Sequence, residues 1–427
     1  MKLNYKRTII TGLAFMAISG FWALYDTILP LILFKSFHLS DVWIGVVMAM
    51  DNVFALILLP IFGIWSDKTN TRLGKRMPFI VIGTSLAISL ISFMPFFDNS
   101  RNLLMFLITT GLVLLAMAFY RSPAVALMPD ITPRKLRSKG NAVIMLMGTV
   151  GYVYSMIMIK LLVKKTEGTD TPDYTLLFIS IVLFMFVSTL ILVLAVPENK
   201  WAKEVRDNDT DEEAEENVNA GKKISRDKLK SLIFLLLSVF FWYMSYNAVI
   251  SAFSRYSLQV LGFDEGDFAT YTLAATVVAV ISYLPIGMIS SKFGRKKVIL
   301  AGVAGLGAAF AVCTFVNSGG ALLYILFGIV GVSWGAINVN SFPMVVEIAS
   351  DGDEGRYTGY YYTFSMAAQV LTPILSGAFL QYVAYRTLFP YGVVFAILAF
   401  CTMLMVKHGD IIKNDKKSLL EHLDVDS

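Results

Sequence analysis

Four ionisable side chains interrupt long apolar stretches of this sequence: Asp26, Asp51, Arg121 and Arg255. A charge at the centre of a membrane-spanning helix costs at least about 2.5 to 3.5 kcal/mol on insertion scales, so such groups usually face a cavity and pair with something. A carboxylate that is partly dehydrated and lies beside a second carboxylate binds a proton more readily than one in water. The four residues are therefore the first candidates for function, and one acid of the Asp26 and Asp51 pair could bind a proton near neutral pH.

Asp26 and Asp51 lie at similar depth when about 1.5 Å per residue is counted from the outer helix ends, so they could share one aqueous cavity. Trp22 lies one helical turn before Asp26 on the same face, with Tyr25 directly before Asp26. An aromatic face beside a carboxylate that accepts hydroxyl hydrogens is a sensible sugar site. The alternative is that the two acids only accept hydrogen bonds from neighbouring helices and that Trp22 only packs.

Arg121 is the strongest single candidate, because a guanidinium stays charged at physiological pH and offers five donors in a rigid fork. The residue count places it deeper than Asp51, so a direct ion pair requires helix tilt or a break at Pro123. Its partner is left open. Arg255 lies close to the outer end of its apolar stretch, where snorkelling to the headgroups explains it as well as a function does.

The elements that position these residues follow from composition. Of the 427 residues, 56% are hydrophobic and 16% charged, whereas a soluble globular chain carries about 25% charged residues. Lipid permits only helices or closed barrels, and one helical span takes about 20 apolar residues. The sequence therefore predicts an all-α membrane protein with spans near 8–34, 42–65, 78–96, 102–128, 140–162, 175–196, 231–258, 267–290, 297–316, 320–347, 357–381 and 387–406.

The domain organisation follows from the placement of these spans and of the basic residues. We expect a first six-helix bundle at 1–196, a linker at 197–230, a second bundle at 231–406 and a tail at 407–427. Most Lys and Arg fall on the side of both termini, which indicates that both ends, the linker and the tail are cytoplasmic in an inner membrane. The linker, with its acidic run at 207–216, reads as a plain solvated segment, although a regulatory docking role is open.

The two halves repeat each other. The loop after the second span and the loop after the eighth share a proline, glycines, a serine and a basic cluster: Pro60, Gly63, Ser66, Lys68, Gly74, Lys75 and Arg76 against Pro285, Gly287, Ser290, Lys292, Gly294, Arg295 and Lys296. Two six-helix halves related by a parallel repeat are typical of a rocking transporter with its substrate site at the midplane between them. We expect Trp334, Asn338 and Gln369 in the second half to complete the sugar site.

Opposite charges also cluster at the expected cytoplasmic helix ends. We interpret them as a gate that closes that side and separates for inward release, which is the bistable element that alternating access needs. The alternative is a set of topology-setting basic residues with incidental acids. The gate residues are Asp67, Arg76, Asp130 and Arg137 in the first half, and Arg295, Glu347 and Arg356 in the second.

Two segments resemble a known family. The stretch SDKTNTRLGKRMPFI at 66–80 and the stretch RSPAVALMPD at 121–130 are similar to those of the sucrose-proton symporters and of the bacterial glycoside, pentoside and hexuronide symporters, within the major facilitator superfamily. The resemblance implies a sugar or glycoside symporter. It also implies that Asp26 is a sugar-binding acid and that Arg121 acts in substrate binding and coupling.

One departure from the sodium-using melibiose permease branch is informative. That branch has acids before the proline of the second span and at the position of Arg121, whereas this sequence has Leu59 and a cation there. A hard cation such as sodium needs several oxygen ligands, so a proton is the better coupling ion. We therefore expect Asp26, Asp51 and Arg121 to couple proton and sugar movement.

The sequence thus predicts a proton-coupled symporter for a glucoside or a disaccharide such as sucrose or maltose, acting as a monomer in the bilayer. Cys313 and Cys401 both lie in apolar runs, so neither a disulfide framework nor a cysteine metal site is available. We also expect no cofactor, no metal and no nucleic-acid partner. The competing transporter interpretation is a proton-driven exporter of amphipathic compounds. A membrane-embedded enzyme is a third and less favoured interpretation, because it would need a nucleophile with a base, or a metal cluster, inside the spans. The sequence offers neither there and has no histidine inside the spans, so we do not expect an enzyme.

Overall fold

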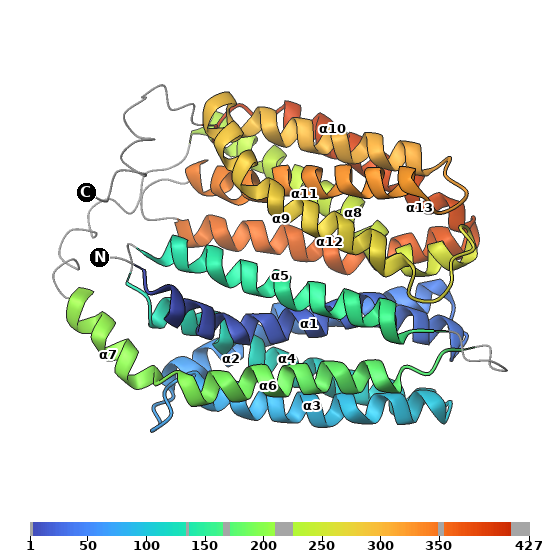
Figure 1. Ribbon diagram of the computed structural model, residues 1–427. Helices are drawn as coiled ribbons and strands as arrows, with labels where there is room; N and C mark the ends of the chain where they lie inside the picture. Colours follow the sequence, from blue (N-terminus) through green and yellow to red (C-terminus); the bar gives the residue numbers. More distant parts are fainter. Residues whose placement is uncertain (1–2, 134–135, 165–170, 210–224, 349–353, 411–427) are drawn as a thin grey trace. The chain divides into compact units, whose positions relative to one another are not determined.

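A computed structural model describes residues 3–133, 136–164, 171–209, 225–348 and 354–410, which are almost entirely helical (Figure 1). Twelve of the helices in these ranges are long and apolar enough to cross a membrane. The predicted all-α class and its twelve spans are confirmed. The helices are α1 Tyr5–Lys35, α2 Asp41–Lys68, α3 Met77–Asn99, α4 Leu103–Asp130, α5 Arg137–Leu162, α6 Thr175–Ala195, α7 Glu198–Asp209, α8 Arg226–Gln259, α9 Phe268–Phe293, α10 Arg295–Cys313, α11 Ala321–Ile348, α12 Glu354–Tyr382, the short 3-10 helix η2 Tyr385–Thr387, and α13 Leu388–Leu404.

The outward faces of the spans are apolar. Leu194 on α6 and Leu284 on α9 are each 78% exposed, and large apolar side chains project outward from every span. Exposed apolar area of this kind is unfavourable in water and favourable in hydrocarbon, where only a helix satisfies its own backbone. The solvent of these helices is lipid.

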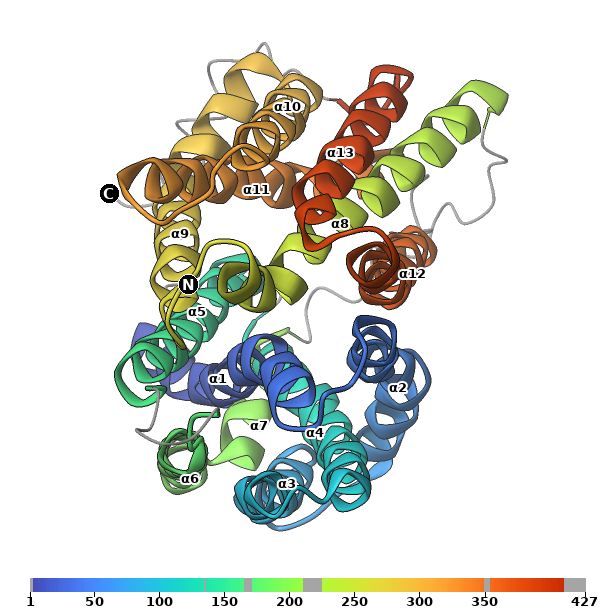
Figure 2. The ribbon, with the colours of Figure 1, turned by 90° about the vertical axis from the view of Figure 1, so that its right-hand side faces the viewer.

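The chain packs into two compact units. Unit 1 holds Met1–Asn217, Ile250–Leu273 and Val370–Thr387, and unit 2 holds Val218–Val249, Ala274–Gln369 and Leu388–Ser427. In unit 1, α1 packs on α5 and α6, and α4 packs on α2 and α3, as the end-on view in Figure 2 shows for α3 and α4. In unit 2, α10 packs on α11 and α13. Helices α8, α9 and α12 contribute to both units, so the units are not the two sequence halves; the halves as separate bundles remain a prediction.

Helix α1 is held along its length by side chains of its neighbours. Tyr120 on α4 donates a hydrogen bond to the carbonyl of Ala14 at 2.7 Å, and Ser155 on α5 donates to the carbonyl of Gly20 at 2.7 Å. Such hydrogen bonds fix one helix against another where water is absent. They set the orientation of the α1 segment that carries Trp22, Tyr25 and Asp26.

The expected linker contains structure at both ends. Residues 198–209 form α7, and α8 begins at Arg226 rather than near 231. The interpretation of 197–230 as a plain solvated segment is therefore wrong for α7, whose Glu198 and Trp201 are buried. Most of the acidic run, 210–216, and most of the tail, 411–427, lie outside the described residues. Below, the linker end of a helix is the end at which α6 stops and α8 starts, and the far end is the end at which α1 stops and α2 starts.

Candidate functional site

Three charged residues from three helices of unit 1 come together: Asp26 on α1, Asp51 on α2 and Arg121 on α4. Each is half-buried. Asp26 interacts electrostatically with both Asp51 and Arg121, and Asp51 interacts with Arg121. Asn52 donates from Nδ2 to Asp51 Oδ1 at 2.7 Å. Residue counting left the partner of Arg121 open; because α4 packs against both α1 and α2, both acids are its electrostatic partners.

Two aromatic side chains of α1 border this charged cluster. The Arg121 guanidinium lies over the Trp22 ring, 5.6 Å from its centroid. Trp22 and Tyr25 meet edge to face at 5.3 Å, and Tyr25 donates a long hydrogen bond of 3.4 Å to the carbonyl of Val47 on α2. Among the described residues, the buried Nε1 of Trp22 has no hydrogen-bond partner. The structure thus brings together Trp22, Tyr25, Asp26, Asp51 and Arg121, which we call the membrane cluster.

The membrane cluster combines side chains whose chemistry suits proton binding with side chains whose chemistry suits hydroxyl groups and a sugar ring. Two carboxylates and one guanidinium leave one negative charge in excess, and a single bound proton neutralises it. Carboxylate oxygens accept from hydroxyl groups, the guanidinium donates to them, and an aromatic face covers the apolar side of a sugar ring. A group of three or more His, Cys, Asp or Glu side chains that could hold a metal is absent from the described residues.

The predicted sugar residues of the second half lie in unit 2. Trp334 on α11 stacks on Tyr246 of α8, with 3.8 Å between the ring centroids and 2° between the planes, and meets Tyr243 edge to face at 5.3 Å. Asn338 lies one helical turn further along α11 and is half-buried. Gln369 donates to the carbonyl of Ser365 on its own helix at 3.3 Å. Their participation in one site with Asp26 remains a prediction.

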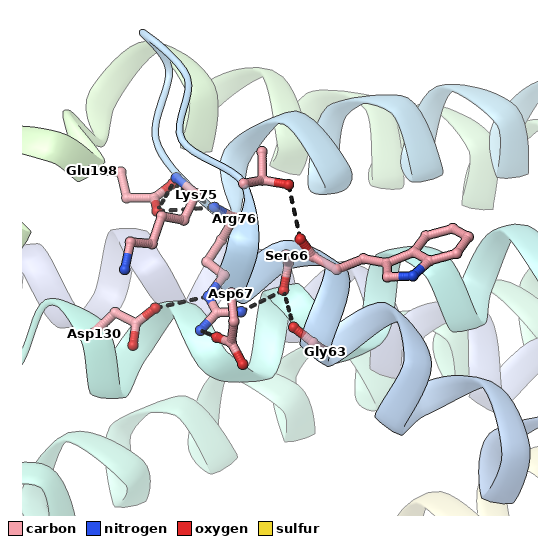
Figure 3. Close-up of polar contacts among 9 residues, drawn as sticks. Gly63, Ser66, Asp67, Lys75, Arg76, Asp130 and Glu198 are labelled. Carbon is pink, nitrogen blue, oxygen red and sulfur yellow. Dashed lines mark hydrogen bonds and ion pairs between the residues drawn. The ribbon is translucent and has the colours of Figure 1, made fainter.

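Arg76 is the centre of a second cluster, at the linker end of unit 1 (Figure 3). Its Nε donates to Asp130 Oδ2 at 2.8 Å, and its two Nη atoms donate to Ser66 and Asp67. Burial alone would lower the pKa of Arg76, but the hydrogen bonds and charges of Asp130 and Asp67 outweigh it and raise that pKa. Arg76 therefore stays cationic and joins the loop after α2 to the end of α4.

The remaining predicted gate residues are distributed as follows. In unit 2, Arg295 Nη1 lies 2.6 Å from Glu347 Oε2. Arg356 donates from Nε to the hydroxyl of Tyr360 at 2.7 Å. The side chain of Arg137 lies outside the described part of the chain. Each ion pair named here joins residues of one unit, so the gating role of the set stays a prediction.

Glu198, the first residue of α7, is a site residue that sequence reasoning missed. Its carboxylate accepts hydrogen bonds from the backbone N–H groups of Lys75, Arg76 and Met77, at 2.7 to 3.1 Å. A carboxylate at the N-terminus of a helix satisfies its orphan donors and its dipole, so Glu198 caps α3 from another element. The signal in the sequence was the Glu directly after Pro197, which is typical of a helix start.

Replacing Glu198 by glutamine is expected to lower the stability of the linker end. Hydrogen bonds to a charged acceptor are worth about 1.5 to 3 kcal/mol, and an amide keeps only part of that. The apparent melting temperature of the purified protein should fall by several degrees. Glu204→Gln is the matched control, because Glu204 forms a 2.5 Å ion pair with Arg7 in which both side chains are 40% exposed; such pairs contribute about 0 to 1 kcal/mol. Equal shifts for the two variants would contradict the capping role.

The structure does not support the interpretation that Arg255 snorkels to the headgroups. Its side chain is 3% exposed and lies 3.2 Å from the carboxylate of Asp41, whose side chain is 6% exposed. A snorkelling side chain would reach the headgroup region instead. Asp41 was missed because it lies at a helix start, where an acid is ordinary.

Twelve candidate membrane spans, three of which carry a cluster of two acids and an arginine, indicate a secondary transporter of the major facilitator fold. Residues 10–388 match the family described as MFS/sugar transport protein, and the chain belongs to that family. The predicted resemblance to the superfamily and to sucrose transporters is confirmed. Over 152 residues the chain is 28% identical to the sucrose transport protein SUC3 of Arabidopsis thaliana, in an alignment that covers 31% of this chain and 25% of that relative.

Solved structures of transporters share the fold. A mutant of the nucleoside transporter NupG superposes with a TM-score of 0.70 at 15% identity, covering 94% of this chain and 100% of that one. The xylose transporter XylE of E. coli, in an inward open conformation, gives 0.66 at 15% identity over 97% and 98%. A bacterial homologue of the human lysosomal transporter Spinster, inward-facing and occupied, gives 0.61 at 16% identity over 95% of each chain. At this identity the likeness concerns the fold alone.

Proposed function

We propose that this chain is a proton-coupled symporter of a sugar, a glucoside or a disaccharide such as sucrose or maltose, that works by alternating access. It acts as a single chain in the cytoplasmic membrane, with the linker end facing the cytoplasm. The observation that supports the proposal is the membrane cluster, in which two acids, a fixed cation and an aromatic ring lie close to one another. The similarity to a sucrose transport protein supports a sugar as that ligand.

The coupling step follows from charge balance. When both acids are ionised the membrane cluster carries an excess negative charge, which is unfavourable in a dehydrated site. A proton bound by the Asp26 and Asp51 pair neutralises the cluster, so the protonated and sugar-loaded form is the one suited to pass through an occluded state. Proton and sugar are then coupled because both favour the same conformations.

Uptake by the purified protein in liposomes tests the proposal. An imposed pH gradient, acid outside, should drive accumulation of radiolabelled sucrose or maltose, and collapse of the gradient with a protonophore should abolish it. Xylose and a nucleoside are the comparison substrates, because a xylose transporter and a nucleoside transporter share the fold of this chain. Gradient-driven uptake of a nucleoside without any sugar would refute the sugar assignment, and efflux of an amphipathic dye without sugar uptake would favour the exporter.

Sodium should be dispensable for this uptake. Arg121 adds a fixed positive charge beside the two acids, whereas a hard cation such as sodium needs several oxygen ligands. Replacing all sodium by choline at constant pH gradient should leave the initial rate of uptake unchanged within error. A strict requirement for sodium would refute proton coupling.

Trp334 should contribute to sugar affinity. Aromatic contacts of this kind are worth about 0.5 to 1.5 kcal/mol beyond the area they bury, so Trp334→Ala should raise the sugar Kd by about tenfold. Isothermal titration calorimetry of the purified protein measures the change. Trp65→Ala is the control, because Trp65 lies on α2 and is 55% exposed; an equal loss of affinity in both variants would remove Trp334 from the site.

A further inference from the structure

The far end of unit 1 contains a buried ion pair between segments distant in sequence. Asp41 opens α2, and its Oδ1 lies 3.2 Å from Nη1 of Arg255 near the end of α8. Tyr385 in η2 donates from its hydroxyl to Asp41 Oδ2 at 2.7 Å. These three residues, which we call the far-end lock, join the first half of the chain to two segments of the second half, Ile250–Leu273 and Val370–Thr387, that pack in the same unit.

Backbones meet beside the lock. A Cβ atom added to Gly377 of α12 would lie 2.4 Å from the carbonyl oxygen of Asp41, and one added to Gly45 of α2 would lie 2.2 Å from the carbonyl oxygen of Pro373. Both distances are shorter than any van der Waals contact. Helices α2 and α12 therefore touch through glycine, and no side chain fits between them while this end is closed.

The chemistry of the lock suits a contact that opens and closes. Asp41 Oδ1 and the Nε and Nη1 atoms of Arg255 are buried, and in the described part of the chain they lack a partner with hydrogen-bond geometry. A buried ion pair with incomplete hydrogen bonding gains little net stability, because desolvation offsets the attraction of the charges. Loss of one partner is different, since it leaves an uncompensated charge in the closed state.

Two further ion pairs lie at the same end, Lys35 with Glu265 and Lys160 with Asp267. The second is exposed, at 45% and 36% of its two side chains, so we expect it to contribute little. It joins α5 to the residue before α9, across the same pair of chain halves as the lock. It is therefore a matched control for the effect of burial.

We propose that Asp41, Arg255 and Tyr385 close the far end of the transport pathway and separate each time that end opens. They are positioning residues, since they act on the conformation and lie apart from the membrane cluster in sequence and along the helices. The proposal rests on the alternating access of the proposed function. It says nothing about which solute is carried, so its test needs no substrate.

Cysteine labelling tests the lock. In a background with Cys313 and Cys401 replaced by serine, Thr272→Cys is the reporter, because Thr272 on α9 is 2% exposed and its hydroxyl contacts Met156 of α5 at 3.4 Å. In lipid nanodiscs a hydrophilic maleimide should label this cysteine slowly. Adding Asp41→Asn should raise the labelling rate by about tenfold or more, since Arg255 gains water only when the far end opens.

Further variants separate opening from loss of fold. The charge-reversed pair Asp41→Arg with Arg255→Asp should label more slowly than Asp41→Asn, because the buried charges are paired again. Gly377→Ala should speed labelling by a steric route that leaves every charge in place. Lys160→Gln should leave the rate within about twofold, as expected for an exposed pair.

Two results would overturn the lock: a rate for Asp41→Asn no higher than that for Lys160→Gln, or a reversed pair no slower than Asp41→Asn. Absence of sugar transport in the unmodified protein with the expected labelling pattern would refute the proposed function and leave the lock standing. Normal gradient-driven uptake together with a labelling rate that Asp41→Asn does not change would refute the lock and leave the proposed function standing.

Discussion

Replacing Arg121 by alanine is expected to abolish sugar uptake while the protein still inserts in the membrane. Arg121 is the fixed cation beside Asp26 and Asp51, and without it two like charges face each other in a dehydrated site with no counter-charge. The charge balance on which coupling depends is then lost. The guanidinium donors to a sugar hydroxyl are lost in the same variant, so coupling and binding fail together.

The size of the effect follows from the loss of a half-buried charge partner. Removing one partner of a buried pair costs about 3 to 5 kcal/mol, so the initial rate of gradient-driven uptake should fall by at least about a hundredfold. Arg121→Lys keeps the charge without the planar fork and should retain partial activity. Arg101→Ala is the control, since Arg101 is an arginine at the far end whose side chain is 47% exposed, and it should transport normally. Near-normal uptake by Arg121→Ala would remove the central assignment.

The sequence sufficed for the spans because their signal is strong and local. Lipid forces each apolar run of sufficient length to be a helix. The observed α2 Asp41–Lys68 contains the predicted 42–65, and α11 Ala321–Ile348 differs from the predicted 320–347 by one residue at each end. The residues of the Arg76 cluster could also be selected from the sequence, because the loop that carries Arg76 is repeated after the eighth span. The membrane cluster could be nominated for a similar reason: a charge in an apolar run is rare enough to be noticed one residue at a time.

Pairings between distant segments could not be predicted in the same way. Asp41 and Arg255 are separated by about half of the chain, and nothing in either local stretch indicates that the start of α2 meets the end of α8. Residue counting along straight helices also placed Arg121 too deep to meet Asp51 without tilt, because depth along one axis ignores how α4 packs on α1 and α2. Helix α7 was not predicted for a further reason. A short polar helix that borders an acidic run has the same low hydrophobicity and high charge as a disordered linker.

Replacing Asp26 or Asp51 by asparagine is expected to separate sugar accumulation from sugar exchange. Asparagine has nearly the shape of aspartate but binds no proton, so the membrane cluster is neutral when the remaining carboxylate is ionised beside the guanidinium. This neutral cluster resembles the protonated form of the unmodified protein, which we expect to exchange sugar across the membrane. Because the variant does not bind the coupling proton, a proton gradient cannot drive sugar accumulation by it.

The expected size of the loss is set by the gradient. One pH unit is worth about 1.4 kcal/mol per proton, so one proton per sugar supports about tenfold accumulation across a one-unit gradient. In both variants the accumulation ratio should fall to about one, whereas exchange of radiolabelled for unlabelled sugar should continue in Asp51→Asn. Asp26→Asn should in addition bind sugar more weakly, because Asp26 lies one turn from Trp22 on α1.

Asp173→Asn is the matched control, since Asp173 is an exposed carboxylate outside the spans whose pKa is lowered by its hydrogen bond with Thr175. It should accumulate sugar normally. If Asp26→Asn and Asp51→Asn both retained tenfold accumulation, neither acid would carry the coupling proton. If one variant retained accumulation and the other lost it, the proton would belong to the second acid alone, and the role of the retained acid would be confined to sugar binding or packing.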